Sequence, residues 1–170
     1  MPMPVQELPQ AGMKWKKLNI FRRSFELRAQ DQRFGTLEWE SMLGNQARGE
    51  ILGSAWVFRR HGFLKQIVTL RKPGTEAAAG IIRYCWSGDG VLELESGRRY
   101  HWKRLSFWGC RWAWVDDAGT EKIRFRLEGF LHGCASVELS DGRDGDVALL
   151  VLLGWYLRVL AEGDAAVVAA

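Results

Sequence analysis

The chain has few of the residues on which covalent frameworks depend. It contains three cysteines, Cys85, Cys110 and Cys134, and no closely spaced pair among them, which argues against a disulfide framework. Its first residues, Met-Pro-Met-Pro-Val-Gln-Glu, lack the charged and then apolar pattern of an export signal. We therefore expect a reducing, cytoplasmic setting, in which the three thiols are buried as small apolar side chains.

Recognisable catalytic and metal-binding motifs are also lacking. His61, His101, His132 and Cys134 are the candidate zinc ligands, but the last two are only two residues apart and no second pair completes a tetrahedral site. Cys134 with His101 or His132 stays open as a remote thiol nucleophile. We expect a protein that is not an enzyme and that needs no cofactor and no metal.

An acidic, Gly-rich turn at residues 141–146 precedes the most apolar part of the chain. Its three aspartates would repel a phosphate, which argues against a nucleotide loop. Asp144 and Asp146 are instead predicted to accept the free amide hydrogens of a helix start. Calcium binding by Asp141, Asp144 and Asp146 is the alternative, although the closing glutamate of a helical calcium loop is absent.

No apolar run is long enough to cross a membrane. The longest, residues 147–161, has 15 residues and would form a helix of about 22 Å, whereas the hydrocarbon core is about 30 Å thick. A helix that is apolar on every side must be buried on every side. We predict a central helix at 146–162, closed by Gly163.

Before this helix the sequence consists of short segments that alternate apolar and polar residues, separated by turns containing glycine. The clearest hairpin joins Phe25–Arg28 to Gly35–Glu40. About ten to twelve such segments favour a sandwich or barrel, and the apolar helix favours a barrel that encloses it. We therefore predict an all-β fold with one helix: a closed antiparallel barrel of about twelve strands around a buried C-terminal helix. The nine tryptophans are interpreted as packing residues of these strands.

Two features resemble the tubby C-terminal and LURP-one-like superfamily. Residues 137–150 are similar to its final strand, Gly turn, Asp and buried helix, and Trp114–Gly119 resembles its repeated Asp-x-x-Gly units. The resemblance covers residues 18–162, leaving 1–17 as a tail or first strand and 163–170 as a tail. It implies a closed barrel threaded by a helix, and its relatives include phosphoinositide-binding tubby domains and phospholipid scramblases. No functional residue is transferred by position.

Positive charge is concentrated in the first part of the chain. The net charge is +4, but six acids and only two arginines follow residue 137, so the preceding residues carry +8. Basic clusters of this kind attract phosphates of lipid head groups or nucleic acids. The segment 105–112 is predicted to be an exposed aromatic loop. The candidate binding patch comprises Arg98, Arg99, Lys103, Arg104, Trp108 and Arg111.

These observations lead us to expect a non-catalytic binding or signalling module. Anionic phospholipid head groups, phosphoinositides among them, are the expected ligand class, and the protein would associate peripherally with a membrane. A protein-interaction domain is the first alternative. A single-stranded nucleic-acid binder is the second, because basic and aromatic residues alternate near the candidate patch.

Overall fold

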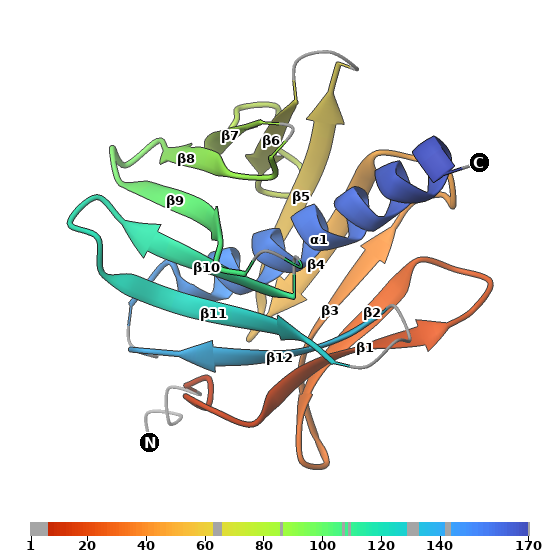
Figure 1. Ribbon diagram of the computed structural model, residues 1–170. Coiled ribbons are helices and arrows are strands. Elements are labelled where there is room, and N and C mark those ends of the chain that lie inside the picture. Colours follow the sequence, from red (N-terminus) through yellow and green to blue (C-terminus); the bar gives the residue numbers. More distant parts are fainter. Residues whose placement is uncertain are drawn as a thin grey trace.

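The computed structural model describes residues 7–62, 66–85, 87–106, 108, 110–128, 133–141 and 144–169, which form one closed antiparallel barrel around one helix (Figure 1). The strands are β1 (Met13–Asn19), β2 (Ser24–Ala29), β3 (Gln32–Trp39), β4 (Gln46–Ile51), β5 (Ser54–His61), β6 (Ile67–Arg71), β7 (Gly80–Tyr84), β8 (Gly90–Leu94), β9 (Arg99–Arg104), β10 (Arg111–Asp116), β11 (Glu121–Leu127) and β12 (Cys134–Leu139). The helix is α1 (Val147–Ala169). The predicted fold class is confirmed.

The turns between strands follow from Asp and Gly residues. In the β10–β11 turn, the backbone carbonyl of Asp116 accepts a hydrogen bond from the N–H of Gly119 at 3.0 Å, and its carboxylate accepts one from the N–H of Thr120 at 2.9 Å. Gly119 has a φ of +84°, which glycine adopts without steric cost. The predicted Asp-x-x-Gly unit at 116–119 is therefore a tight turn between neighbouring strands.

The barrel closes where the first strand meets the last. Met13 and Trp15 of β1 pair with Val137 and Ala135 of β12, and the other edge of β1 pairs with β2. The barrel thus begins at residue 13 and not at residue 18, because β1 is needed to leave no exposed sheet edge. The sequence predicts residues 1–17 to be either a tail or a first strand. The second interpretation is correct from Met13 onward, where β1 begins.

The barrel buries the helix on every side. From residue 147 to residue 160 the side chains of α1 are buried, apart from two that are half-buried. Trp15 stacks on Trp155 with 6.2 Å between ring centroids, and the indole N–H of Trp114 donates a 2.8 Å hydrogen bond to the carbonyl of Leu150. Within the described part of the chain, no helix is both long and apolar enough to pass through a bilayer.

The prediction that α1 ends at Gly163, and that 163–170 is a tail, is wrong. The helix continues to Ala169, with Gly163 in its interior. Contacts with the barrel hold its last turns: Arg60 donates hydrogen bonds of 2.8 and 2.7 Å to the carboxylate of Asp164, and Arg23 donates one of 3.4 Å to the carbonyl of Val159. These contacts, together with the alanines that follow, let the helix continue past a glycine that has no need to adopt a left-handed conformation.

Most of the tryptophans are buried in the core of the barrel. Seven of the nine are buried, one is exposed, and Trp86 lies outside the described residues. The buried ones are Trp15, Trp39, Trp56, Trp102, Trp112, Trp114 and Trp155. Their interpretation as core residues is confirmed for these seven, and Trp108 is the exception.

Glycine lets the helix approach the barrel wall closely. A Cβ atom at Gly154 would lie 2.5 Å from the ring of Phe125 and 3.0 Å from the indole nitrogen of Trp114. On the opposite wall, a Cβ at Gly49 would lie 2.7 Å from the side chain of Leu152. The distances to Phe125 and Leu152 are too short for real Cβ contacts, so glycine sets the separation between helix and sheet at these points.

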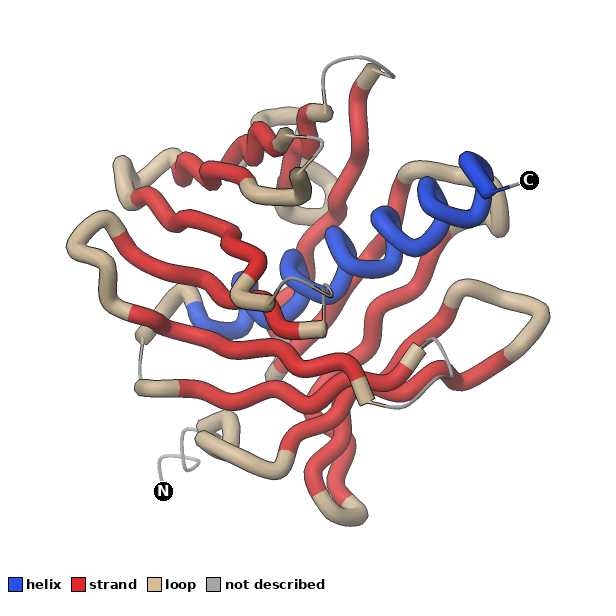
Figure 2. The backbone as a smooth tube through the Cα atoms, in the orientation of Figure 1, coloured by secondary structure: helices blue, strands red, loops and turns tan. Residues whose placement is uncertain are grey.

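The two ends of the barrel differ in which loops they carry. Because every neighbouring pair of strands is antiparallel, alternate connections lie at opposite ends. We call the end where α1 begins the base; it carries the β2–β3, β4–β5, β6–β7, β8–β9 and β10–β11 turns. The end from which α1 leaves is the rim, and it carries the other strand connections. Figure 2 shows the helix running between the strands from one end to the other.

We predict that Leu153→Asp unfolds the protein. Leu153 has no exposed surface, so an aspartate there would be an unpaired charge in a closed apolar core. We expect a loss of more than ~4 kcal/mol in the free energy of unfolding, measured by urea denaturation. Val167→Asp, on the exposed end of the same helix, is the control and should change little. Normal stability of Leu153→Asp would contradict the central-helix fold.

Two glycines of α1 are predicted to respond in opposite directions to alanine. Gly154→Ala should lower the free energy of unfolding by about 1–3 kcal/mol, because its Cβ collides with Phe125. Gly163→Ala should raise it by up to ~1 kcal/mol, because the nearest atom is the end of the Arg23 side chain at 3.4 Å and alanine favours the helix. Thermal melting of both variants tests this, and equal shifts would contradict it.

Candidate functional site

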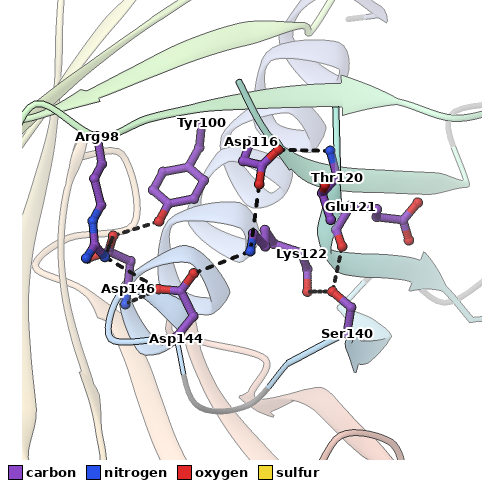
Figure 3. Close-up of polar contacts among 9 residues, drawn as sticks. All are labelled: Arg98, Tyr100, Asp116, Thr120, Glu121, Lys122, Ser140, Asp144 and Asp146. Carbon is purple, nitrogen blue, oxygen red and sulfur yellow. Dashed lines mark hydrogen bonds and ion pairs between the residues drawn. The ribbon is translucent and has the colours of Figure 1, made fainter. Parts of the chain in front are cut away.

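A polar network at the base fixes the start of the helix (Figure 3). The Asp146 carboxylate accepts hydrogen bonds from Arg98 at 3.0 Å and from the Tyr100 hydroxyl at 2.7 Å. Lys122 lies between two further carboxylates, 3.8 Å from Asp144 and 3.7 Å from Asp116. The negative charge of the acidic turn is thus balanced by cations from β11 and from the β8–β9 turn.

The capping prediction is correct for one aspartate and wrong for the other. The Asp144 carboxylate accepts a 3.0 Å hydrogen bond from the backbone N–H of Asp146. Asp146 instead directs its carboxylate to Tyr100 and Arg98, while its backbone carbonyl accepts the first helical bond, from Leu150. The difference arises because Tyr100 of β9 and Arg98 of the β8–β9 turn are two strong donors beside Asp146.

The histidines considered as zinc ligands have other hydrogen-bond partners in the structure. His61 bonds to the Thr69 hydroxyl at 2.7 Å and His101 to the Asp117 carboxylate at 2.8 Å. His132, the other histidine of the zinc alternative, lies outside the described residues. In the described ranges, no three His, Cys, Asp or Glu side chains are grouped as metal ligands.

The prediction of buried cysteines is wrong. Cys85 and Cys110 are exposed, and Cys134 is half-buried. All three lie at the rim: Cys85 follows β7, Cys110 precedes β10 and Cys134 begins β12. Apolar neighbours in the sequence did not imply burial, because the thiols lie at strand ends and not at inward-facing positions along a strand.

The six predicted patch residues do not form one patch. Arg98 and Arg99 lie at the base, where Arg98 contacts Asp146 and Arg99 lies 3.7 Å from Asp117. Four residues lie at or near the rim, roughly 17 Å along β9 from the first two; they are Lys103, Arg104, Trp108 and Arg111. Two of the six predicted residues therefore pair with acids at the base, and the other four lie at the opposite end of the barrel.

The predicted exposed loop is correct for Leu105, Trp108 and Cys110 and wrong at its end, while residues 107 and 109 lie outside the described residues. Trp108 is 84% exposed, whereas Trp112 is buried as part of β10. The hydroxyl of Ser106 accepts hydrogen bonds from the backbone N–H groups of Cys110 and Arg111, at 3.1 and 3.2 Å. These bonds fold the loop back on itself and are consistent with the outward position of Trp108.

Exposed apolar side chains are concentrated at the rim. Among the described residues, every large apolar side chain that is exposed lies on a rim loop, beside one, or on the emerging helix: Leu18, Ile20, Phe21, Met42, Leu43, Leu105, Trp108 and Val167. The most exposed is Leu43, at 97%. An end of a barrel that gathers exposed apolar side chains from several loops is a candidate interaction site.

Arg23 holds two of these rim loops and the helix together. Its guanidinium lies 4.6 Å from the centre of the Trp39 ring and donates hydrogen bonds of 3.4 Å to the carbonyls of Gly44 and Val159. Burial lowers the pKa of Arg23. The β1–β2 and β3–β4 loops, which carry Phe21 and Leu43, are thereby fixed relative to the end of α1.

Exposed cations surround the apolar side chains. Lys16, Lys17 and Arg22 lie in or beside the β1–β2 loop, and Arg104 and Arg111 flank the β9–β10 loop. Within the described residues, none of these five forms an ion pair within 4.0 Å, unlike Arg98 and Arg99 at the base. The rim therefore combines apolar tips with exposed cations that form no close ion pair within the described residues.

Searches of known protein families, curated proteins and solved structures found no match to this chain. The resemblance to tubby-like and LURP-one-like proteins stays a prediction. The architecture that it implies, a twelve-stranded closed barrel around a C-terminal helix, is present.

Stability should fall at alkaline pH partly through Tyr100. Burial, and next the hydrogen bond to Asp146, raise the pKa of Tyr100 above its usual value near 10. Unfolded Tyr100 loses its proton near pH 10 while the folded residue keeps it, so stability decreases as pH rises above 10. In Tyr100→Phe the decrease should be smaller by up to ~1.4 kcal/mol per pH unit. Urea unfolding between pH 8 and 11 tests this, and parallel curves for both proteins would contradict it.

Proposed function

We propose that this barrel is a non-catalytic module that binds anionic membrane surfaces through its rim. The observation that carries the proposal is that the exposed large apolar side chains of the described residues all lie at the end that also carries exposed cations. Apolar and aromatic tips enter the interfacial region of a bilayer, and nearby Lys and Arg attract anionic head groups. Phosphoinositides are the lipid class to test first, in a cytoplasmic setting.

The geometry of the helix supports this orientation. α1 leaves the barrel at the rim, and its last described side chains, Ala165, Ala166 and Val167, are apolar and exposed. The helix end and the loops carrying Phe21 and Leu43 are held together by Arg23. A surface fixed in advance loses less conformational entropy on binding than mobile loops do.

The composition of the rim favours a membrane over single-stranded nucleic acid. Base stacking requires rings, and only two of the exposed large apolar side chains, Phe21 and Trp108, are aromatic. The others are aliphatic or Met side chains, which can enter an acyl region but offer no stacking face. If the protein did not bind vesicles in the experiment described below, a protein partner would become the favoured ligand.

The test is co-sedimentation with vesicles of neutral phosphatidylcholine, alone or with phosphatidylserine or a phosphoinositide, across a salt series. We expect binding to the anionic vesicles that weakens as salt rises. Absence of binding at low salt would overturn the proposal and favour a protein partner.

Two substitutions on one strand locate the surface. Arg104→Gln at the rim should lower the partition coefficient about fivefold, since each cation near an anionic surface contributes about 1 kcal/mol. Arg99→Gln, at the base end of the same strand, should leave it unchanged, because Arg99 faces away from the proposed surface and lies beside Asp117. The double variant Phe21→Ser/Leu43→Ser should weaken binding at every salt concentration. Equal effects of Arg99→Gln and Arg104→Gln would exclude the rim as the binding surface.

A further inference from the structure

A cavity of about 420 Å³ opens at the rim, between the second half of α1 and the wall around β7, β9 and β10. Its lining comes from the end of β7, the β7–β8 turn, β9, β10 and α1. The volume lies within the range of about 300–1,000 Å³ that small-molecule sites occupy. None of its lining residues belongs to the loops that carry Phe21 and Leu43.

The inner wall of the cavity is apolar. Trp102 and Trp112 are buried and stacked, with 5.5 Å between ring centroids and 14° between planes, and Leu157 of the helix faces the same space. Gly88 closes one side, where a Cβ would lie 2.5 Å from the Trp112 ring. Ala161 is exposed and lies at the cavity mouth, so an apolar ligand would enter past a small side chain.

Arg158 is the one cation of α1, and it lines this cavity. Its guanidinium lies 4.9 Å from the centre of the Trp112 ring. Within the described residues its Nε is buried and has no hydrogen-bond partner. Burial lowers the pKa of Arg158, which means that its charge is poorly solvated. A partly desolvated guanidinium beside an apolar wall gains most from a bound anion.

The carboxylate that lines the cavity is already bonded to another residue and does not serve as the acceptor for Arg158. Asp164 also lines it, but both of its carboxylate oxygens accept hydrogen bonds from Arg60. Glu162, one turn beyond Arg158, is the acid that partly offsets the effect of burial on Arg158. The Tyr84 hydroxyl is buried beside the guanidinium of Arg60. Burial raises its pKa more than Arg60 lowers it, so the hydroxyl stays neutral and keeps a proton to donate.

We infer that this cavity binds an amphipathic monocarboxylate of the fatty-acid class, with its carboxylate on Arg158 and its chain along Trp102, Trp112 and Leu157. A planar guanidinium matches a carboxylate in geometry and in charge. One partly buried cation suits one negative charge and not the several charges of a phosphoinositide head group. This inference goes beyond the proposed membrane binding and depends on different residues.

The experiment is isothermal titration of the full chain, without vesicles, with monomeric dodecanoate and with dodecanol as the neutral probe of equal chain length. The wild type should bind dodecanoate at least tenfold more tightly, because a hydrogen bond to a charged group contributes that much. Arg158→Gln should remove this preference and leave dodecanol binding unchanged. Arg111→Gln, an exposed rim cation outside the cavity lining, is the matched control and should behave as the wild type.

A second pair of variants tests the position of the chain. Ala161→Trp should fill the mouth and weaken both probes, whereas Ala166→Trp, exposed on the same helix but outside the cavity lining, should weaken neither. Circular dichroism confirms that each variant is folded. No dodecanoate binding by the wild type, or equal binding by Arg158→Gln, would overturn the inference. Arg104→Gln, which should weaken vesicle binding, should bind dodecanoate as the wild type does. The two experiments therefore test the cavity and the membrane surface independently.

Discussion

The burial of one apolar helix is the constraint on which the rest of the structure depends. A helix without a polar face cannot lie on the surface of a sheet, because part of its circumference would stay in water. A sheet that closes around it buries the whole circumference and at the same time removes its own edges. Glycines at 49 and 154 set how closely the wall approaches, and buried indole rings fill the remaining space.

The two ends of the barrel solve opposite problems. At the base the carboxylate of Asp144 accepts an amide hydrogen at the start of the helix. Lys122 and Arg98, from neighbouring elements, offset the charges of Asp144 and Asp146. At the rim the helix passes out of the barrel, so the end stays open and its loops carry apolar residues. At the base the polar groups are hydrogen-bonded to one another, which is typical of a structural role. At the rim apolar groups face water, which is typical of a binding surface.

The fold could be predicted from the sequence because alternation, turn residues and the apolar run are local signals. The site could not, because it depends on which distant residues meet. Arg98 and Arg104 are six positions apart, yet only contact with Asp146, far along the chain, distinguishes one from the other. Two signals were available: Phe21 follows another apolar residue in a turn rich in cations, and Arg158 is a single cation within an apolar run.

Closure between the first and last strands also determines how the chain can fold. β1 has one neighbour within a few residues, but its second neighbour, β12, is more than a hundred residues away along the chain. A ribosome releases β12 and α1 after the eleven other strands, so those strands wait with an open edge and an unfilled interior. Contacts of such long sequence separation make folding slow, and the open intermediate is the species most exposed to aggregation.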